Sequence, residues 1–274
     1  MMKEVSRCHF FGSINHPKVM LIHGMGFYWE KCFENIIDTL KESCYLIVPE
    51  IVGHHNVIEN TKIRVEDIVQ TIESIMIENR IERIDVVYGI SFGAILASEL
   101  AFRHIIRFNN LILDGAQFVN MGILNRISSI IMAIQFKKIM KNKHMNSYIK
   151  SQMGYLNKNE IEILKPLMCE NISFSSLVSS AYATYSYKIS NKDFIDSNLI
   201  YIYGENEIFS QKSEQLLRQH CNKTFENNIF YNRGHAEVLS KLPNEITKII
   251  NKTLTQVPSI GVDFDEGFKI GKKV

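Results

Sequence analysis

The sequence predicts an α/β fold with a mostly parallel, doubly wound sheet and a helical cap inserted after the sixth strand. Three features predict it. Short β-branched runs alternate with segments of helical periodicity, the alternation stops over residues 117–196, and it resumes from Leu199 to Leu254. We therefore expect residues 1–116 and 197–254 to form the core, with residues 117–196 as a cap, or lid.

The first half of the core alternates regularly between strand and helix. Short apolar runs bounded by turn residues predict strands. Apolar residues spaced by three and four, as from Val65 to Met76, predict helices that cover a sheet. The predicted strands are Lys18–Ile22, Tyr45–Pro49, Ile84–Val87 and Asn110–Leu113, and the helices between and after them are Phe33–Leu40, Val65–Asn79 and Phe92–Arg103.

The predicted cap has the pattern of successive amphipathic helices rich in Ile, Met, Phe and Tyr. Because it begins after Asp114 and ends before Leu199, it should lie over the carboxyl ends of the strands, where open α/β sheets bind ligands. Residues 255–274 form a C-terminal extension to which the pattern assigns no role. After the cap we expect strands at Leu199–Tyr203 and Thr224–Tyr231 and helices at Gln211–His220 and Asn244–Leu254.

Composition excludes several classes of protein. The formal net charge is +2, from 31 basic and 29 acidic residues, which predicts no nucleic-acid partner. The five cysteines are odd in number and form no CxxC pair, so neither a disulfide framework nor a zinc site is expected. The N-terminus lacks the pattern of a secretory signal, and charged residues interrupt the apolar stretch Ile123–Met140, which suggests an amphipathic helix. We expect a cytoplasmic protein with no membrane span.

Ser91 lies in the pentapeptide Gly89-Ile90-Ser91-Phe92-Gly93, between a predicted strand and a predicted helix. This is the context of a nucleophile elbow, in which the serine backbone is strained and side chains two residues before and after it would clash. Gly89 and Gly93 supply the room. The helix N-terminus would favour the negative charge that develops when the serine attacks a carbonyl group. The pattern predicts Ser91 as a nucleophile.

A serine nucleophile needs a base, and the base needs an orienting carboxylate. His235 follows the last predicted strand, at the same edge of the sheet as Ser91, and is the leading base among nine histidines. Glu205 and Glu207 follow the strand that ends near Tyr203 and are candidates for the carboxylate.

Four motifs along the chain, HGMG, GISFG, YGENE and GHAE, resemble those of the α/β-hydrolase family in their order and cover the chain from about Val19 to Leu254. The resemblance implies a triad in the order serine, acid, histidine, with the acid three residues after a glycine. That position is Glu207, a glutamate where aspartate is usual. Glu205 and Asp114 remain alternatives, and Asp114 is the stronger, because some family members carry the acid at the end of that strand.

The resemblance also implies an oxyanion hole built from the backbone N–H groups of Met25 and Phe92. The glycines on either side of Met25 would let the loop turn its N–H groups inward. Phe27 and Trp29 follow this loop and predict a pocket for a hydrophobic acyl or aryl group.

The predicted activity is that of a cofactor-independent serine hydrolase of esterase, lipase or thioesterase type, acting on a small-molecule acyl substrate through an acyl-enzyme. No metal is expected, because the His54-His55 pair has no neighbouring ligand pattern. Two alternatives stay open: hydrolysis of a C–C bond or acyl transfer on the same scaffold, and a non-catalytic protein that binds a small molecule. The sequence predicts no oligomeric state.

Overall fold

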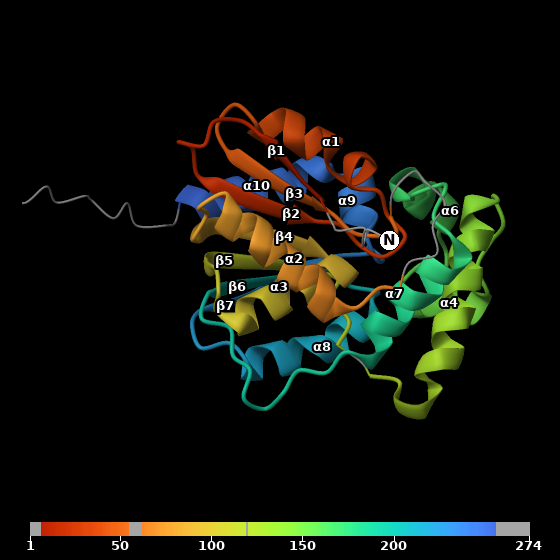
Figure 1. Cartoon of the computed structure of the whole chain (residues 1–274). Helices are drawn as coiled ribbons and strands as arrows, with labels where there is room; N and C mark the ends of the chain where they lie inside the picture. Colours follow the sequence, from red (N-terminus) through yellow and green to blue (C-terminus); the bar gives the residue numbers. More distant parts are fainter. Residues whose placement is uncertain (1–6, 55–61, 119, 256–274) are drawn as a thin grey trace, which may run out of the picture.

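A seven-stranded sheet forms the centre of the computed structural model, which describes residues 7–54, 62–118 and 120–255 (Figure 1). The strand order is β1-β3-β2-β4-β5-β6-β7, with β1 antiparallel to β3 and all other neighbours parallel. The predicted α/β class with a mostly parallel sheet is confirmed. The strands are β1 (Arg7–Phe11), β2 (Lys18–Ile22), β3 (Tyr45–Glu50), β4 (Arg83–Ile90), β5 (Arg107–Asp114), β6 (Asn198–Gly204) and β7 (Phe225–Phe230).

Strand β1 is the one described strand that the sequence pattern did not predict. Its five residues RCHFF are exposed or half-buried, because β1 lies at the edge of the sheet and pairs only with β3. An edge strand of this kind has neither the continuous apolar run of a central parallel strand nor a clean alternation.

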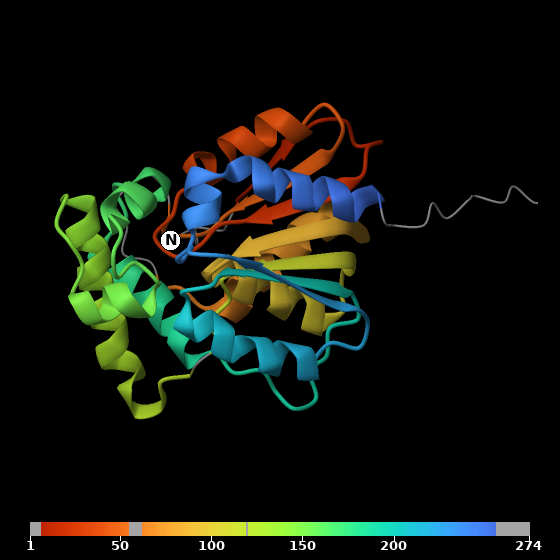
Figure 2. The same cartoon turned by 180° about the vertical axis from the view of Figure 1, so that it is seen from behind.

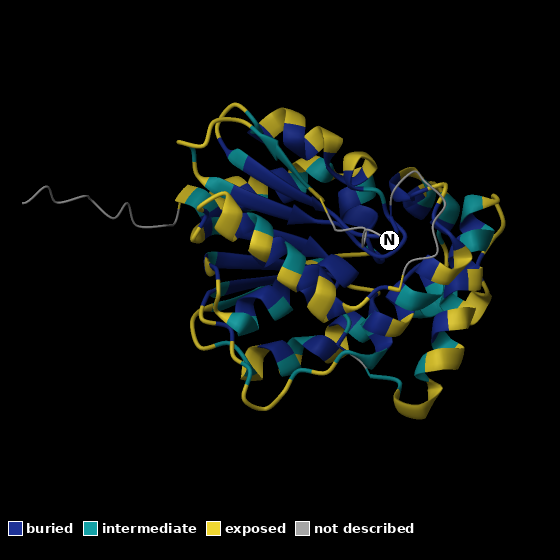
Figure 3. Ribbon diagram, viewed as in Figure 1, coloured by how far each residue is buried: buried dark blue, intermediate teal, exposed yellow. Residues whose placement is uncertain are grey.

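Helices cover both faces of the sheet, as the doubly wound pattern predicts. Helices α1 and α10 pack together on one face, and α2 and α3 pack together on the other (Figures 1 and 2). The strands from β2 to β6 are mostly buried, and exposed residues lie on the outer sides of the helices (Figure 3). The helices of the core are α1 (Trp29–Leu40), α2 (Val65–Glu78), α3 (Phe92–Arg103), α8 (Ile208–Gln219), α9 (Glu237–Lys241) and α10 (Pro243–Thr255).

We call residues 117–196 the helical insertion. Its described residues form helices and no named strand, and it follows β5, which ends at Asp114. The strand that precedes it is β5, the fifth strand in the described chain and not a sixth as predicted. Figures 1 and 2 show the insertion beyond one end of the sheet. It contains η1 (Gly122–Leu124), α4 (Asn125–Met140), α5 (Ser147–Gln152), α6 (Glu160–Leu164), η2 (Lys165–Leu167) and α7 (Phe174–Ser186).

Two further expectations concern the end of the chain and membranes. Except for Thr255, which ends α10, the extension at residues 255–274 lies outside the described residues. In the part of the chain that the structure describes, no helix combines the length and the apolar character needed to cross a bilayer.

Candidate active site

Ser91 occupies a strained turn between β4 and α3. Its backbone has φ 55° and ψ −116°, a conformation that non-glycine residues rarely adopt and that costs about 1–3 kcal/mol. A Cβ atom at Gly89 would lie 2.5 Å from the carbonyl oxygen of Gly93, and one at Gly93 would lie 2.2 Å from that of Ile22. The two glycines therefore allow the close approach that the sequence pattern predicted.

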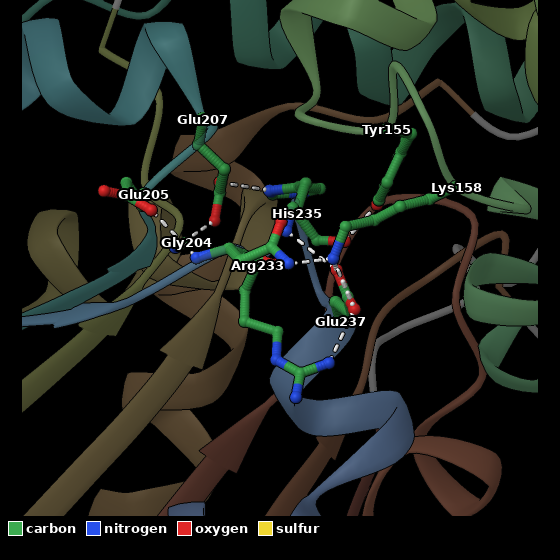
Figure 4. Close-up of polar contacts among 10 residues, drawn as sticks. Tyr155, Lys158, Gly204, Glu205, Glu207, Arg233, His235 and Glu237 are labelled. Atoms are coloured by element: carbon green, nitrogen blue, oxygen red, sulfur yellow. Dashed lines mark hydrogen bonds and ion pairs between the residues drawn. The ribbon is translucent and has the colours of Figure 1, made fainter.

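His235 and Glu207 form a buried hydrogen-bonded pair (Figure 4). The distance between His235 Nδ1 and Glu207 Oε2 is 2.8 Å, and only 3% of His235 and 1% of Glu207 are exposed. Glu207 also accepts hydrogen bonds from the Gly204 N–H at 2.7 Å and from the Ser210 hydroxyl at 2.8 Å. These three donors fix the carboxylate, which in turn orients the imidazole ring.

The end of β5 links Ser91 to this pair. The Ser91 N–H donates to the carbonyl oxygen of Asp114 at 2.8 Å. The next residue is Gly115, where a Cβ atom would lie 2.8 Å from His235 Nδ1 and 2.9 Å from Glu207 Oε2. Ser91, Glu207 and His235 thus follow three parallel strands at one edge of the sheet. Within the described residues, the Ser91 hydroxyl makes no hydrogen bond.

The surroundings of His235 favour its protonated form. Burial alone would lower the pKa of the imidazole, but the charge of Glu207, its hydrogen bond and the charge of Asp114 together raise the pKa above the ordinary histidine value. With Nδ1 donating to Glu207, the neutral ring keeps Nε2 free to accept a proton.

The rival acids have other partners. The Asp114 carboxylate accepts a hydrogen bond from the Tyr88 hydroxyl at 2.6 Å. Burial, followed by the charge of Glu207, raises the pKa of Asp114 to about 7, although the hydrogen bond from Tyr88 and the charge of His235 oppose this shift. Glu205 is exposed and accepts from the backbone N–H of Asn232. Of the three carboxylates, Glu207 is the one bonded to His235.

The predicted oxyanion-hole donors stay available. The backbone N–H groups of Met25 and Phe92 donate no hydrogen bond to any described residue. Phe92 is the first residue of α3, where helices leave N–H groups without internal acceptors.

The two predicted pocket residues lie in different surroundings. The Phe27 ring lies against Gly24, in the loop that carries Met25, and stacks on Phe136 of the helical insertion, with 6.5 Å between ring centroids. The Trp29 ring instead stacks on His9 of β1, with 4.1 Å between centroids. Phe27, unlike Trp29, therefore contacts the loop that carries Met25.

The histidines near this loop have structural contacts. His23 accepts a hydrogen bond from the Ile51 N–H through Nε2, and its Nδ1 lies 3.0 Å from the Gly24 carbonyl oxygen. Its ring meets that of His54 edge-on, while His55 lies outside the described residues. Among the residues described, no group of His, Cys, Asp and Glu has the arrangement of a metal site.

A cluster of polar residues that the sequence did not predict joins the insertion to the loop that carries His235 (Figure 4). We call this cluster the junction. Lys158 lies 2.7 and 2.8 Å from the two carboxylate oxygens of Glu237, and Arg233 donates to the same carboxylate at 2.8 Å. The Tyr155 hydroxyl donates a hydrogen bond to the carbonyl oxygen of His235. The backbone N–H of His235 donates to the carbonyl oxygen of Met153 at 2.9 Å.

Hydrogen bonds and ion pairs in the junction stabilise the charged form of Glu237. Burial alone would raise the pKa of Glu237, but hydrogen bonds from Lys158, Gly234 and Arg233 lower it below the ordinary glutamate value. The GHAE motif contains Glu237 and could have pointed to it. No sequence signal marks Tyr155 or Lys158, which lie about 80 positions before their partners.

Comparison with solved structures identifies the family. Over 90% of this chain and 100% of the other, the chain is 36% identical to a protein from Desulfitobacterium hafniense assigned to the alpha/beta hydrolase family, with a TM-score of 0.88. The chain belongs to the α/β-hydrolase family.

Two more distant α/β hydrolases share the fold alone. The chain is 15% identical to a thermophilic esterase from Thermogutta terrifontis, with a TM-score of 0.70 over 91% of this chain and 93% of the other. It is 13% identical to an enol-lactonase from Burkholderia xenovorans, with a TM-score of 0.70 over 92% and 96%. No family model matches the sequence. A search of curated proteins finds no significant match.

Proposed function

We propose that this α/β hydrolase is a serine hydrolase that cleaves a carboxylic ester or thioester with a hydrophobic acyl or aryl group. The observation that carries the proposal is the buried His235–Glu207 hydrogen bond beside the strained turn at Ser91. A hydrogen-bonded base and acid next to a serine on an elbow are the parts that acyl transfer requires.

In the acylation step, Ser91 Oγ attacks the carbonyl carbon of the substrate while His235 Nε2 takes the hydroxyl proton. Glu207, held by the Gly204 N–H and the Ser210 hydroxyl, keeps Nδ1 protonated and stabilises the imidazolium. The imidazolium then gives the proton to the departing alcohol or thiol. The products of this step are an acyl-Ser91 ester and neutral His235.

In the deacylation step, His235 takes a proton from a water molecule as its oxygen attacks the acyl-enzyme. The proton passes back to Ser91 when the carboxylic acid leaves. In both steps the backbone N–H groups of Met25 and Phe92, which donate to no described residue, stabilise the negative oxygen of the tetrahedral intermediate.

The helical insertion acts as the cap over this site, with residues 117–196 as a unit separate from the core. Supporting this role, Phe136 of α4 packs on Phe27, and Met168 forms a β-bridge with the same residue. The Phe27–Phe136 contact supports an apolar surface beside the loop that carries Met25, which would favour a hydrophobic acyl group.

We also assign the protein to the cytoplasm. All five cysteines lie within the described residues and none forms a disulfide, as expected of a protein in a reducing compartment.

Hydrolysis of p-nitrophenyl esters from acetate to decanoate, with matched thioesters, tests the proposal. We expect turnover by the wild-type chain, a preference for apolar acyl groups, and a loss of at least about 10⁴-fold in kcat for Ser91→Ala. Ser98→Ala is the control, because Ser98 is a buried serine on α3 whose hydroxyl bonds to the backbone of its own helix. Full activity in Ser91→Ala would rule out the proposed nucleophile.

A further inference from the structure

The near-neutral net charge of the chain hides an uneven distribution. Residues 115–159 contain seven basic residues and no Asp or Glu. The rest of the chain contains the other 24 basic residues and all 29 acidic ones. The first half of the helical insertion is therefore strongly basic, although the whole chain is nearly neutral. The seven are Arg126, Lys137, Lys138, Lys141, Lys143, Lys150 and Lys158.

Helix α4, within this basic segment, is apolar on two opposite sides. Its inner side, with Ala133, Phe136 and Ile139, is buried, and the helix packs against α7. The other side, which we call the α4 outer face, carries exposed isoleucines at spacings of three and four. It comprises Ile123 (98% exposed) and Leu124 of η1 with Ile127 (57% exposed), Ile130, Ile131 and Ile134 of α4.

Cations without acidic partners flank the α4 outer face. Lys138 and Lys141 follow Ile134 by four and seven residues, so they continue the same side of the helix. Lys143 lies just beyond, and Arg126 lies at the other end. Among the described residues none of these four forms an ion pair, whereas Lys150 pairs with Glu160 and Lys158 with Glu237.

We propose that the α4 outer face docks on an anionic lipid surface. Exposed isoleucines would enter the boundary between headgroups and acyl chains, and the lysines and Arg126 would lie against lipid phosphates. The helix would lie in the plane of the bilayer without crossing it.

The composition of the face favours lipid over a protein partner. Protein interfaces are depleted in lysine and enriched in aromatic residues, whereas this face consists of isoleucine and unpaired cations. A second copy of the chain is disfavoured for a different reason: a twofold contact would bring two sets of uncompensated cations together.

Vesicle sedimentation with the full chain tests the proposal independently of any enzymatic activity. We expect binding to phosphatidylcholine vesicles that contain one-third phosphatidylglycerol, weakening as salt rises, and at least tenfold weaker binding to pure phosphatidylcholine. Ile127→Ser/Ile130→Ser/Ile134→Ser should bind at least tenfold more weakly. The matched control removes three exposed isoleucines elsewhere, Ile14→Ser/Ile77→Ser/Ile229→Ser, and should bind as the wild type does.

A second pair of variants tests the charges. Lys138→Gln/Lys141→Gln/Lys143→Gln should weaken binding by about fivefold for each lysine, whereas the exposed control Lys62→Gln/Lys192→Gln/Lys241→Gln should not. Circular dichroism and size-exclusion chromatography verify that each variant is folded.

Three results would overturn the proposal. One is equal binding to neutral and anionic vesicles, and another is no binding to anionic vesicles, which would leave an acidic protein as the partner. The third is a wild-type dimer that the Ile127→Ser/Ile130→Ser/Ile134→Ser variant converts to monomer, which would assign the face to a second copy.

Discussion

At the carboxyl edge of the sheet, Glu207 and Glu237 are buried, and each accepts several hydrogen bonds. On the α4 outer face, by contrast, exposed isoleucines lie beside cations that form no ion pair with a described residue. Buried and satisfied polar groups hold one geometry, which catalysis needs. An exposed apolar face beside unpaired charges indicates an interaction surface, because monomeric proteins rarely leave such a face in contact with water. The two regions thus differ in their proposed roles: the carboxyl edge holds side chains in one geometry, and the α4 outer face binds a partner surface.

The junction connects these regions through Tyr155 and Lys158 of the insertion, which bind the loop that carries His235. The insertion is therefore held to the edge of the sheet at the junction (Figure 4), and α4 lies farther from the sheet (Figure 1). Variants at the edge and at the junction test how this geometry is held, and the isoleucine and lysine variants above test the α4 outer face.

The largest effect is expected within the edge, where two carboxylates lie near His235. Glu207→Gln should lower the acylation rate by about 10⁴-fold, because the amide no longer holds the correct imidazole tautomer or stabilises the imidazolium. Asp114→Asn should lower it by less than about tenfold, because Asp114 bonds to Tyr88. Pre-steady-state kinetics with a chromogenic ester measures both rates. A larger loss in Asp114→Asn than in Glu207→Gln would reverse the assignment of the acid.

Glu207→Gln should also change the pH profile. Because the charge of Glu207 raises the pKa of His235, the wild-type acid limb of kcat/KM should lie above pH 6.5, and the variant's residual activity should have its limb at lower pH. An unchanged limb in the variant would mean that Glu207 does not set the protonation of His235.

A smaller effect is expected at the junction. Glu237→Gln leaves Lys158 without its carboxylate in a mostly buried place, which should lower the free energy of unfolding by about 3 kcal/mol. Urea denaturation measures this loss. The control is Glu245→Gln, which breaks the exposed pair with Lys248 and should cost less than about 1 kcal/mol. Equal losses in the two variants would show that the junction does not hold the insertion to the edge.

The smallest effect is expected at Asp114, and it depends on pH. The folded-state pKa of about 7 lies above the ordinary value of 3.8, so ionisation of Asp114 lowers the stability of the wild type as pH rises from 4 to 7. Asp114→Asn cannot ionise. Relative to the wild type, it should therefore gain about 2 kcal/mol in the free energy of unfolding between pH 5 and pH 8.

Urea denaturation at the two pH values gives that difference. A stability difference between Asp114→Asn and the wild type that is the same at pH 5 and pH 8 would mean that Asp114 does not titrate in this window.

Local patterns made the fold and much of the candidate site predictable. The strands from β2 to β7, the turn at Ser91 and the positions of His235 and Glu207 follow from short apolar runs, two glycines and the placing of motifs at strand ends. The choice between Glu207 and Asp114 depends on which carboxylate reaches the imidazole and which reaches Tyr88. Side-chain contacts between separate strands decide that choice, and no local pattern encodes them.

Long-range contacts and distribution of charge explain the rest. The junction joins residues about 80 positions apart, so no periodicity reveals it. The stretch Ile123–Met140 was predicted as an amphipathic helix. It is helical in η1 and α4, but it is apolar on two opposite sides, of which one is exposed, and the pattern could not reveal this. Which side of α4 is buried depends on where α7 packs against it, and that is a long-range contact.

Covalent labelling of Ser91 tests the central claim most directly. The folded wild-type chain is treated with a fluorophosphonate, which reacts with activated serines, and the modified residue is located by peptide mass spectrometry. The account predicts stoichiometric labelling at Ser91, none in Ser91→Ala, and much slower labelling in Glu207→Gln than in Asp114→Asn. An unlabelled Ser91 in folded wild-type protein, or labelling at another serine, would contradict it.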